Sequence, residues 1–99
     1  MTFMHVAVFV WNDDVDRVAA GAAVSDALRA YVAKIDGVES YHCGPDAGIT
    51  PGTSDFAVVG RFATREAFLV YRDDSRHQAI LSDLIIPRLA SRSVVQVED

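Results

Sequence analysis

The chain has 99 residues, of which 51% are hydrophobic and 23% are charged, and its formal net charge is −5. This length suits one domain with one core, so we expect a single domain over residues 1–99, and the composition argues against disorder. The acidic balance argues against nucleic-acid partners, and the lack of an apolar run near the roughly 18 residues of a transmembrane helix argues against a membrane partner.

The first element that the sequence predicts is a strand from Phe3 to Trp11. Its residues are almost all apolar, and many are β-branched or aromatic, which is typical of strands. His5 is the polar exception. Alternation places His5 on one face with Phe3, Ala7, Phe9 and Trp11, and it places Met4, Val6, Val8 and Val10 on the other. Because both faces are apolar, we expect both to be covered.

A long amphipathic helix is predicted next, with Asp13 or Asp14 as its N-cap and its end near Lys34. Apolar residues recur at helical spacing at Val24, Leu28, Tyr31, Val32 and Ile35. Gly21 lowers the helix propensity by roughly 1 kcal/mol, so it indicates a tight contact. Gly37 then gives the helix a typical ending.

Three further strands are predicted, from Val38 to about Gly44, from Phe56 to Phe62, and from Ser93 to Glu98. The segment from Gly44 to Thr53 is rich in Gly and Pro, so we expect it to be a loop between two strands. A loop of this length either covers a site or is a plain long connection, and the sequence does not decide between the two.

Two short helices are predicted between the last two strands. Thr64 is the expected N-cap of a helix from Arg65 to about Arg72. Ser75 and Gln78 have the spacing of a capping box, so we expect a second helix to begin at Ser75. Pro87 limits this helix, because the residue before a proline is disfavoured in the α region.

His77 would lie in the first turn of this second helix. Free N–H groups and the positive end of the helix dipole disfavour an imidazolium there, and a neutral ring can act as a base. The nearby carboxylates of Asp73 and Asp74 have the opposite effect, because a negative charge favours the protonated ring. The protonation state of His77 is therefore left open.

The order of elements is β-α-β-β-α-β, which is typical of a ferredoxin-like α+β fold: a four-stranded antiparallel sheet with its helices on one face. The other face carries Met4, Val6, Val8 and Val10, and a monomer would expose them. Large apolar surfaces usually mark an interface. We therefore expect a homodimer that forms through the apolar sheet face.

Several segments together resemble the stress-responsive α/β-barrel (Dabb) family. They are Met4-His5-Val-Ala-Val-Phe-Val-Trp, Ile35-Asp-Gly37-Val, the strand from Asp55 to Phe62, and Tyr71-Arg-Asp-Asp-Ser-Arg-His77 followed by Pro87. The resemblance covers essentially the whole chain. It implies two ferredoxin-like subunits that join into a dimeric α+β barrel.

The chain is also distantly similar to a catalytic member of this family, the plant olivetolic acid cyclase, which closes a linear polyketide thioester by an aldol reaction without a cofactor. The resemblance matches His5 to a first-strand histidine of that enzyme, and Tyr71 and His77 to its tyrosine and second histidine. It implies that His77 takes a proton, that the Tyr71 hydroxyl stabilises the enolate, and that His5 orients the substrate or His77. The family's usual His-Pro is Asp74-Ser75 here, and the cyclase's pocket tyrosine falls at Leu28.

We therefore expect a barrel that binds a small apolar molecule between sheet and helices, with cofactor-free cyclase-like or lyase-like chemistry by His77, Tyr71 and His5. Two alternatives stay open. One is a non-catalytic stress-response or stability protein, in which these residues are structural. The other is a cofactor-independent monooxygenase, which Trp11 and the histidines would permit.

No metal site is expected from the sequence. His5, His42, His77 and Cys43 are possible ligands, but they lack the spacing of known metal motifs, and neighbours on a strand point to opposite faces. Cys43 is the single cysteine of the chain, so no intramolecular disulfide can form, and we expect a reducing, cytoplasmic location.

Overall fold

The computed structural model describes residues 2–99. The main elements in chain order are β1 (Phe3–Trp11), α1 (Arg17–Val32), β2 (Val38–Pro45), β3 (Phe56–Phe62), α2 (Arg65–Asp73), α3 (Ser75–Ile80) and β4 (Leu89–Glu98). A π-helical segment, η1 (Leu81–Ile85), and a 3₁₀ turn, η2 (Ile86–Arg88), connect α3 to β4. Within residues 2–99, none of these helices has the length and apolar character needed to cross a bilayer.

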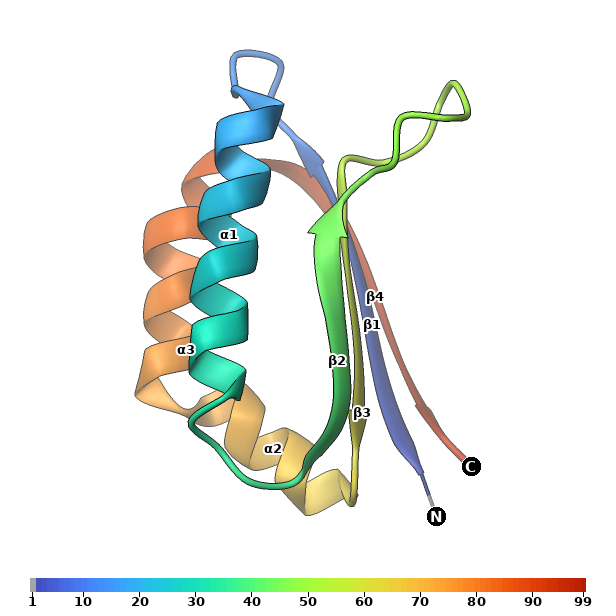
Figure 1. Cartoon of the computed structure of the whole chain (residues 1–99), viewed down its shortest axis with the longest axis vertical. Helices are drawn as coiled ribbons and strands as arrows, with labels where there is room; N and C mark the ends of the chain where they lie inside the picture. Colours follow the sequence, from blue (N-terminus) through green and yellow to red (C-terminus); the bar gives the residue numbers. More distant parts are fainter. Residues whose placement is uncertain (1) are drawn as a thin grey trace.

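The strands within residues 2–99 form one four-stranded sheet with the order β2-β3-β1-β4, and every neighbouring pair is antiparallel. All helices cover the same face of this sheet, and both ends of the described chain lie at the same end of it (Figure 1). This arrangement confirms the predicted ferredoxin-like α+β fold. It also leaves β4 at one edge of the sheet, beside β1.

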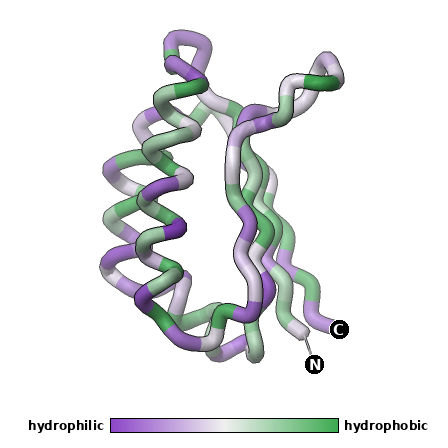
Figure 2. The backbone as a smooth tube through the Cα atoms, in the orientation of Figure 1, coloured by the Kyte–Doolittle hydropathy of each residue, from purple (hydrophilic) through white to green (hydrophobic). Residues whose placement is uncertain are grey.

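The face of β1 that was predicted from alternation is confirmed. Phe3, Ala7, Phe9 and Trp11 are buried beneath the helices, whereas Val10 on the opposite face is exposed. The core beneath α1 joins Ala7, Phe9 and Trp11 to Val24 and Leu28 of α1 and to Phe56 and Val58 of β3, whereas Phe3 belongs to a second cluster with Phe68 of α2. Figure 2 shows hydrophobic residues along much of the sheet, and Val10, Val95 and Val97 are among those that stay exposed.

The predicted start of α1 is wrong by two or three residues. Asp16 is the N-cap, and its carboxylate accepts hydrogen bonds from the backbone N–H groups of Val18 and Ala19, each at 3.1 Å. Asp13 and Asp14 instead lie in a turn that the Val15 N–H closes by donating to the Asn12 carbonyl at 3.1 Å. A turn at the end of β1 therefore comes before the helix and uses these two residues.

The tight contact expected at Gly21 is present. A Cβ atom on Gly21 would lie 3.2 Å from Cβ of Pro45, so α1 approaches the end of β2 more closely than most residues allow. Gly37 follows the helix with φ of +83°, a conformation that favours glycine. A Cβ atom there would also collide with Ala67 of α2.

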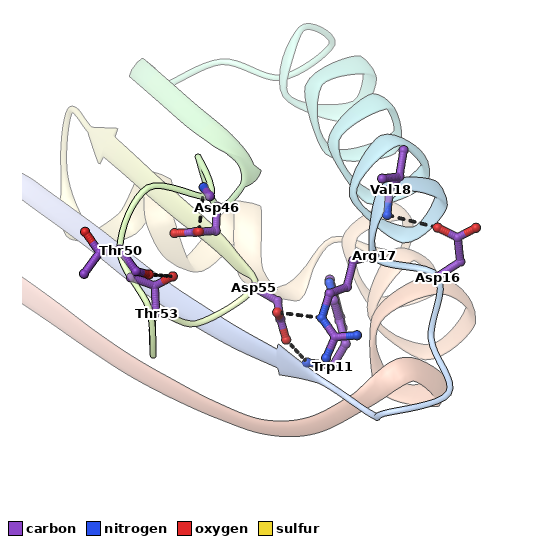
Figure 3. A network of polar contacts seen from close by, with 9 residues as sticks. Trp11, Asp16, Arg17, Val18, Asp46, Thr50, Thr53 and Asp55 are labelled. Carbon is purple, nitrogen blue, oxygen red and sulfur yellow. Dashed lines mark hydrogen bonds and ion pairs between the residues drawn. The ribbon is translucent and has the colours of Figure 1, made fainter.

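The loop between β2 and β3 projects beyond the end of the sheet (Figure 1). Asp55, the last residue of the loop, anchors it to β1 and α1. The Asp55 carboxylate accepts from the Trp11 N–H at 2.8 Å and from Nε of Arg17 at 2.9 Å (Figure 3). The Gly48 N–H donates to the Asp46 carboxylate at 2.8 Å and closes a local turn. Asp55 thus ties together the ends of β1 and of this loop and the start of α1.

The predicted capping box at Ser75 is wrong, although α3 does begin there. Asp74 is the N-cap, with extended backbone angles, and its carboxylate accepts from the Arg76 N–H at 2.8 Å. Its own N–H still donates to the Val70 carbonyl at 3.1 Å, so one residue ends α2 and starts α3. The Gln78 side chain reaches the Arg72 carbonyl instead of the cap.

The last strand begins at Leu89, four residues before the predicted Ser93. Pro87 ends the helical segment as expected, within η2. The Asn12 N–H then donates to the Arg88 carbonyl at 2.8 Å, which joins the end of β1 to the start of β4. This early pairing extends β4 along the whole of β1 with a register shift at Trp11.

Candidate functional site

A cavity of about 520 Å³ lies between the helices and the β1–β4 side of the sheet. Its walls combine apolar side chains with two histidines and a tyrosine that come from segments far apart in the sequence. The lining residues are His5, Ala7, Phe9, Leu28, Val58, Phe68, Tyr71, Arg72, His77, Gln78, Leu81, Ile85, Arg92, Val94 and Gln96. The structure therefore brings all three predicted site residues, His5, Tyr71 and His77, to one cavity.

β1 and β4 position His5. The two strands pair so that His5 lies opposite Gln96, and Nε2 of Gln96 is 3.0 Å from Nδ1 of His5. On its other side the His5 ring lies near Phe68 of α2, with 5.0 Å between ring centroids. A strand position, a cross-strand hydrogen bond and an aromatic contact thus hold the ring at the cavity wall.

The break between α2 and α3 positions His77. Helix carbonyls in the last turn lack partners within their own helix. Here the Arg72 carbonyl lies 3.0 Å from Nδ1 of His77 and also accepts from Nε2 of Gln78 at 2.7 Å. A carbonyl oxygen accepts only, so Nδ1 of His77 must carry a proton, and the neutral ring then has its lone pair on Nε2.

Both histidines favour the neutral form. Burial is the largest cause that lowers the pKa of His77, and it outweighs the hydrogen bond to Arg72 and the charges of Asp74 and Asp73, which raise that pKa. Burial also lowers the pKa of His5 to about 4, with a smaller contribution from the charge of His77. The protonation state that the sequence left open is thus decided by burial.

Tyr71 lies between the two histidines. Its ring centroid is 4.4 Å from that of His77 and 6.2 Å from that of His5. The Tyr71 hydroxyl is 2.6 Å from the Tyr41 hydroxyl, and the Tyr31 hydroxyl donates to the Tyr71 carbonyl at 2.9 Å. Burial raises the pKa of the Tyr71 hydroxyl, so it stays protonated at neutral pH.

The cavity has a polar end and a long apolar middle. Along β4, Gln96 lies beside His5 at the polar end of the cavity. Val94 lies beside Ala7 in the middle, and Arg92 lies beside Phe9 at the other end of the cavity. Four residues of strand separate Gln96 from Arg92, which is about 13 Å. The space therefore suits a small molecule with an apolar middle, a polar group at the histidines and room for a second polar group near Arg92.

Comparison with known families agrees with this fold. The profile of the stress-responsive A/B barrel domain, Dabb, matches residues 3–99. The chain belongs to the Dabb family. The family resemblance predicted from the sequence is thereby confirmed over nearly the whole chain.

Solved structures share the Dabb fold with this chain. A dimeric ferredoxin-like protein of unknown function from Thermobifida fusca is 38% identical, with a TM-score of 0.86, over 100% of this chain and 92% of its own. A Dabb family protein from Mesorhizobium loti is 18% identical, with a TM-score of 0.78, over 99% of this chain and 96% of its own.

An enzyme is also among the similar structures. The hydroxynitrile lyase of Passiflora edulis is 10% identical, with a TM-score of 0.77, over 97% of this chain and 91% of its own. At this identity the likeness shows the fold alone. A comparison with curated proteins gave no significant match.

The departures of this chain from the Dabb pattern now have a structural account. Asp74 and Ser75, which replace the usual His-Pro, form the cap and the first residue of α3, so His77 still reaches the cavity. Leu28, at the expected position of a pocket tyrosine, is an apolar wall. Tyr31 lies three residues further along α1 and binds the Tyr71 carbonyl.

Other candidate residues of the sequence lie apart from this site. His42 is exposed on β2, while its neighbour Cys43 is buried beneath the helices, so the two point to opposite faces. Within residues 2–99 no group of three His, Cys, Asp or Glu side chains is placed to hold a metal ion. Trp11 is buried against Phe9 and Phe56 and is not among the described residues that line the cavity.

The sequence reasoning missed Gln96 and Tyr41. Gln96 was assigned to a strand, but only the register of β4 against β1 shows that it faces His5. The available signal in the sequence was the position of Gln96 as a polar residue between two apolar ones, Val95 and Val97. Tyr41 gave no local signal, because its partner Tyr71 is 30 residues away.

Proposed function

We propose that this Dabb protein binds a small, largely apolar carbonyl compound and catalyses cofactor-free acid–base chemistry of the cyclase or lyase type. The observation that carries the proposal is the placement of two neutral histidines, His5 and His77, on the wall of one cavity that also has apolar walls. A general base acts best when it is unprotonated near the working pH and is within reach of the proton that it takes.

His77 is the base in this proposal. Its Nε2 lone pair accepts a proton from the carbon next to the substrate carbonyl, and the electrons of the broken C–H bond form an enolate. His5 and the Tyr71 hydroxyl are the hydrogen-bond donors to the enolate oxygen, with Tyr41 donating to the Tyr71 oxygen. The enolate carbon then attacks a second carbonyl to close a ring, or the reverse steps cleave a C–C bond, and His77 returns its proton.

We also propose that the functional unit is a homodimer that forms through the outer face of the sheet. Val95 and Val97 of β4 are 54% and 44% exposed, and Val10 of β1 is 36% exposed, on the face that no helix covers. Burying such surface stabilises an association by about 25 cal/mol for each Å². The Thermobifida fusca relative, described as dimeric, supports a dimer.

The acid–base proposal predicts exchange of protons next to a carbonyl. We expect the protein to accelerate deuterium exchange at C1 and C3 of 2-nonanone in D₂O, measured by proton NMR. His77→Gln should slow this exchange by about 100-fold or more, because a positioned general base contributes roughly 10²–10⁴ in rate.

His42→Gln is the matched control, because it makes the same substitution away from the cavity, and light scattering should show that this change on the outer face of the sheet leaves the assembly as in the wild-type protein. This variant should exchange 2-nonanone at the wild-type rate. Undiminished exchange by a folded His77→Gln protein would remove His77 from the reaction. Binding of 2-nonanone without exchange by the wild-type protein would instead indicate a non-catalytic binding protein.

A further inference from the structure

We infer that Gln96 is a positioning residue that holds His5 in the tautomer opposite to that of His77, so that one histidine donates a hydrogen bond to the substrate and the other accepts a proton from it. This inference rests on the proposed function for its chemical meaning. The tautomers themselves follow from the hydrogen bonds of the two rings.

The contact between Gln96 and His5 defines the first tautomer. β4 places Gln96 directly opposite His5, and the Gln96 side-chain nitrogen is 3.0 Å from Nδ1 of His5. An amide NH₂ group donates only, so Nδ1 accepts. In a neutral ring the proton must then be on Nε2, the nitrogen that Gln96 does not contact.

The contact between His77 and Arg72 defines the second tautomer. The Arg72 backbone carbonyl, 3.0 Å from Nδ1 of His77, accepts only. Nδ1 of His77 therefore carries the proton, and Nε2 does not. The two rings line one cavity, and their Nε2 atoms have opposite hydrogen-bonding character: Nε2 of His5 carries a proton and Nε2 of His77 carries a lone pair.

This opposition suits a substrate with a carbonyl oxygen next to an acidic C–H group. The N–H of His5 stabilises negative charge on the oxygen while the lone pair of His77 takes the proton. If both rings presented lone pairs, the enolate would lose a donor and face an unfavourable second acceptor. Gln96 prevents this arrangement through its hydrogen bond to His5.

The surroundings of His5 keep the ring neutral, which the tautomer requires. The titratable groups that face it are His77 and Tyr71, and the described contacts of His5 include no carboxylate. Burial lowers the pKa of His5 to about 4. The neutral ring therefore predominates across the physiological range.

The test is ¹⁵N NMR of the histidine side chains at pH 7.5, first in the wild-type protein without substrate. We expect His5 to show a proton on Nε2 and His77 a proton on Nδ1. In Gln96→Glu, a carboxylate replaces the donor, so we expect the Nε2–H form of His5 to be lost in favour of Nδ1–H or of the imidazolium. A wild-type His5 with its proton on Nδ1, or an unchanged His5 tautomer in folded Gln96→Glu, would overturn the inference.

Gln78→Glu is the matched control, because it places the same carboxylate in the cavity lining on α3, near the Arg72 carbonyl, and not on β4 opposite His5. His5 should keep its Nε2–H tautomer in this variant. Exchange of 2-nonanone separates the two proposals. If the wild-type protein shows the two opposite tautomers but does not exchange 2-nonanone, the proposed function alone is overturned. If the wild-type protein exchanges 2-nonanone but His5 carries its proton on Nδ1, the role of Gln96 alone is overturned.

Discussion

The His77 ring lies near Tyr71 of α2 and Tyr31 of α1, with 7% of the residue's surface exposed. Two carboxylates follow Tyr71 along the chain, and their charges favour an imidazolium. They are turned outward, however: Asp73 pairs with Arg72, and Asp74 pairs with Arg76 and caps α3. An arginine thus lies beside each carboxylate and offsets part of its negative charge. Burial of the His77 ring away from water therefore decides the charge of the imidazole.

The neutral histidines should make folding stability depend on pH. His5 has a pKa of about 6.5 in the unfolded chain and about 4 in the fold. As the pH falls from about 6.5 to about 4, the unfolded state binds a proton that the folded state does not, so the free energy of unfolding decreases, by about 3 kcal/mol at most. Burial of His77 acts in the same direction.

Urea unfolding at a fixed protein concentration, at pH 7.0, 6.0 and 5.0, measures this decrease. His5→Gln should show a smaller decrease than the wild-type protein, because only His77 then contributes. The depressed pKa of Asp74, about 2, has its effect between about pH 4 and pH 2, below this window. Equal decreases in the two proteins would contradict a neutral, buried His5.

The break between α2 and α3 is the element on which the site depends. It releases the carbonyls of Tyr71 and Arg72 from the helix ladder, and these carbonyls receive the Tyr31 hydroxyl and the side chains of His77 and Gln78. A continuous helix would have used the same carbonyls internally. The break thus fixes the direction of His77 and the identity of its protonated nitrogen.

Asp74→Ala should reduce the free energy of unfolding by about 1 kcal/mol, because loss of an N-cap side chain typically costs 0.5–2 kcal/mol. Ser75→Ala is the control, because Ser75 is the first residue of α3 and not its cap. Its effect should be within about 0.5 kcal/mol. Thermal and urea unfolding would measure both. A larger loss in Ser75→Ala than in Asp74→Ala would restore the capping box predicted from the sequence.

At the scale of the whole molecule, the two faces of the sheet have different roles. One face supports the core and the cavity, and the other is apolar but has no helix over it (Figure 1). β4 belongs to both, since Gln96 faces the cavity while Val95 and Val97 face outward with Val6 and Met4 of β1. A second copy on the outer face would hold β4, and hence Gln96, in place.

Val95→Asp should convert the dimer to a monomer, because a carboxylate buried in an apolar interface is strongly unfavourable. Light scattering at micromolar concentration should then change from twice 10.8 kDa to 10.8 kDa. Val18→Asp is the control: Val18 is 83% exposed on α1, in the first turn, where a carboxylate is tolerated. A monomeric wild-type protein, or a dimeric Val95→Asp protein, would contradict the proposed interface.

The sequence by itself determined the order of elements, the inward face of β1 and the apolar outer face. These features follow from local periodicity and from apolar alternation, which need no knowledge of distant contacts. The helix signals indicated His77 as a candidate base, and the family resemblance added His5 and Tyr71 as site residues. Their meeting at one cavity depends on how three separate segments pack.

Only the tertiary structure decided which residue caps a helix, which charge state a histidine favours and which nitrogen carries its proton. Asp74 and Ser75 are both good caps, and the bend between two helices selected Asp74. Burial overrode the carboxylates beside His77. The partner of His5 lies 91 residues away, and strand register alone brings Gln96 to it, because hydrogen bonds between distant residues leave no periodic signal in a sequence.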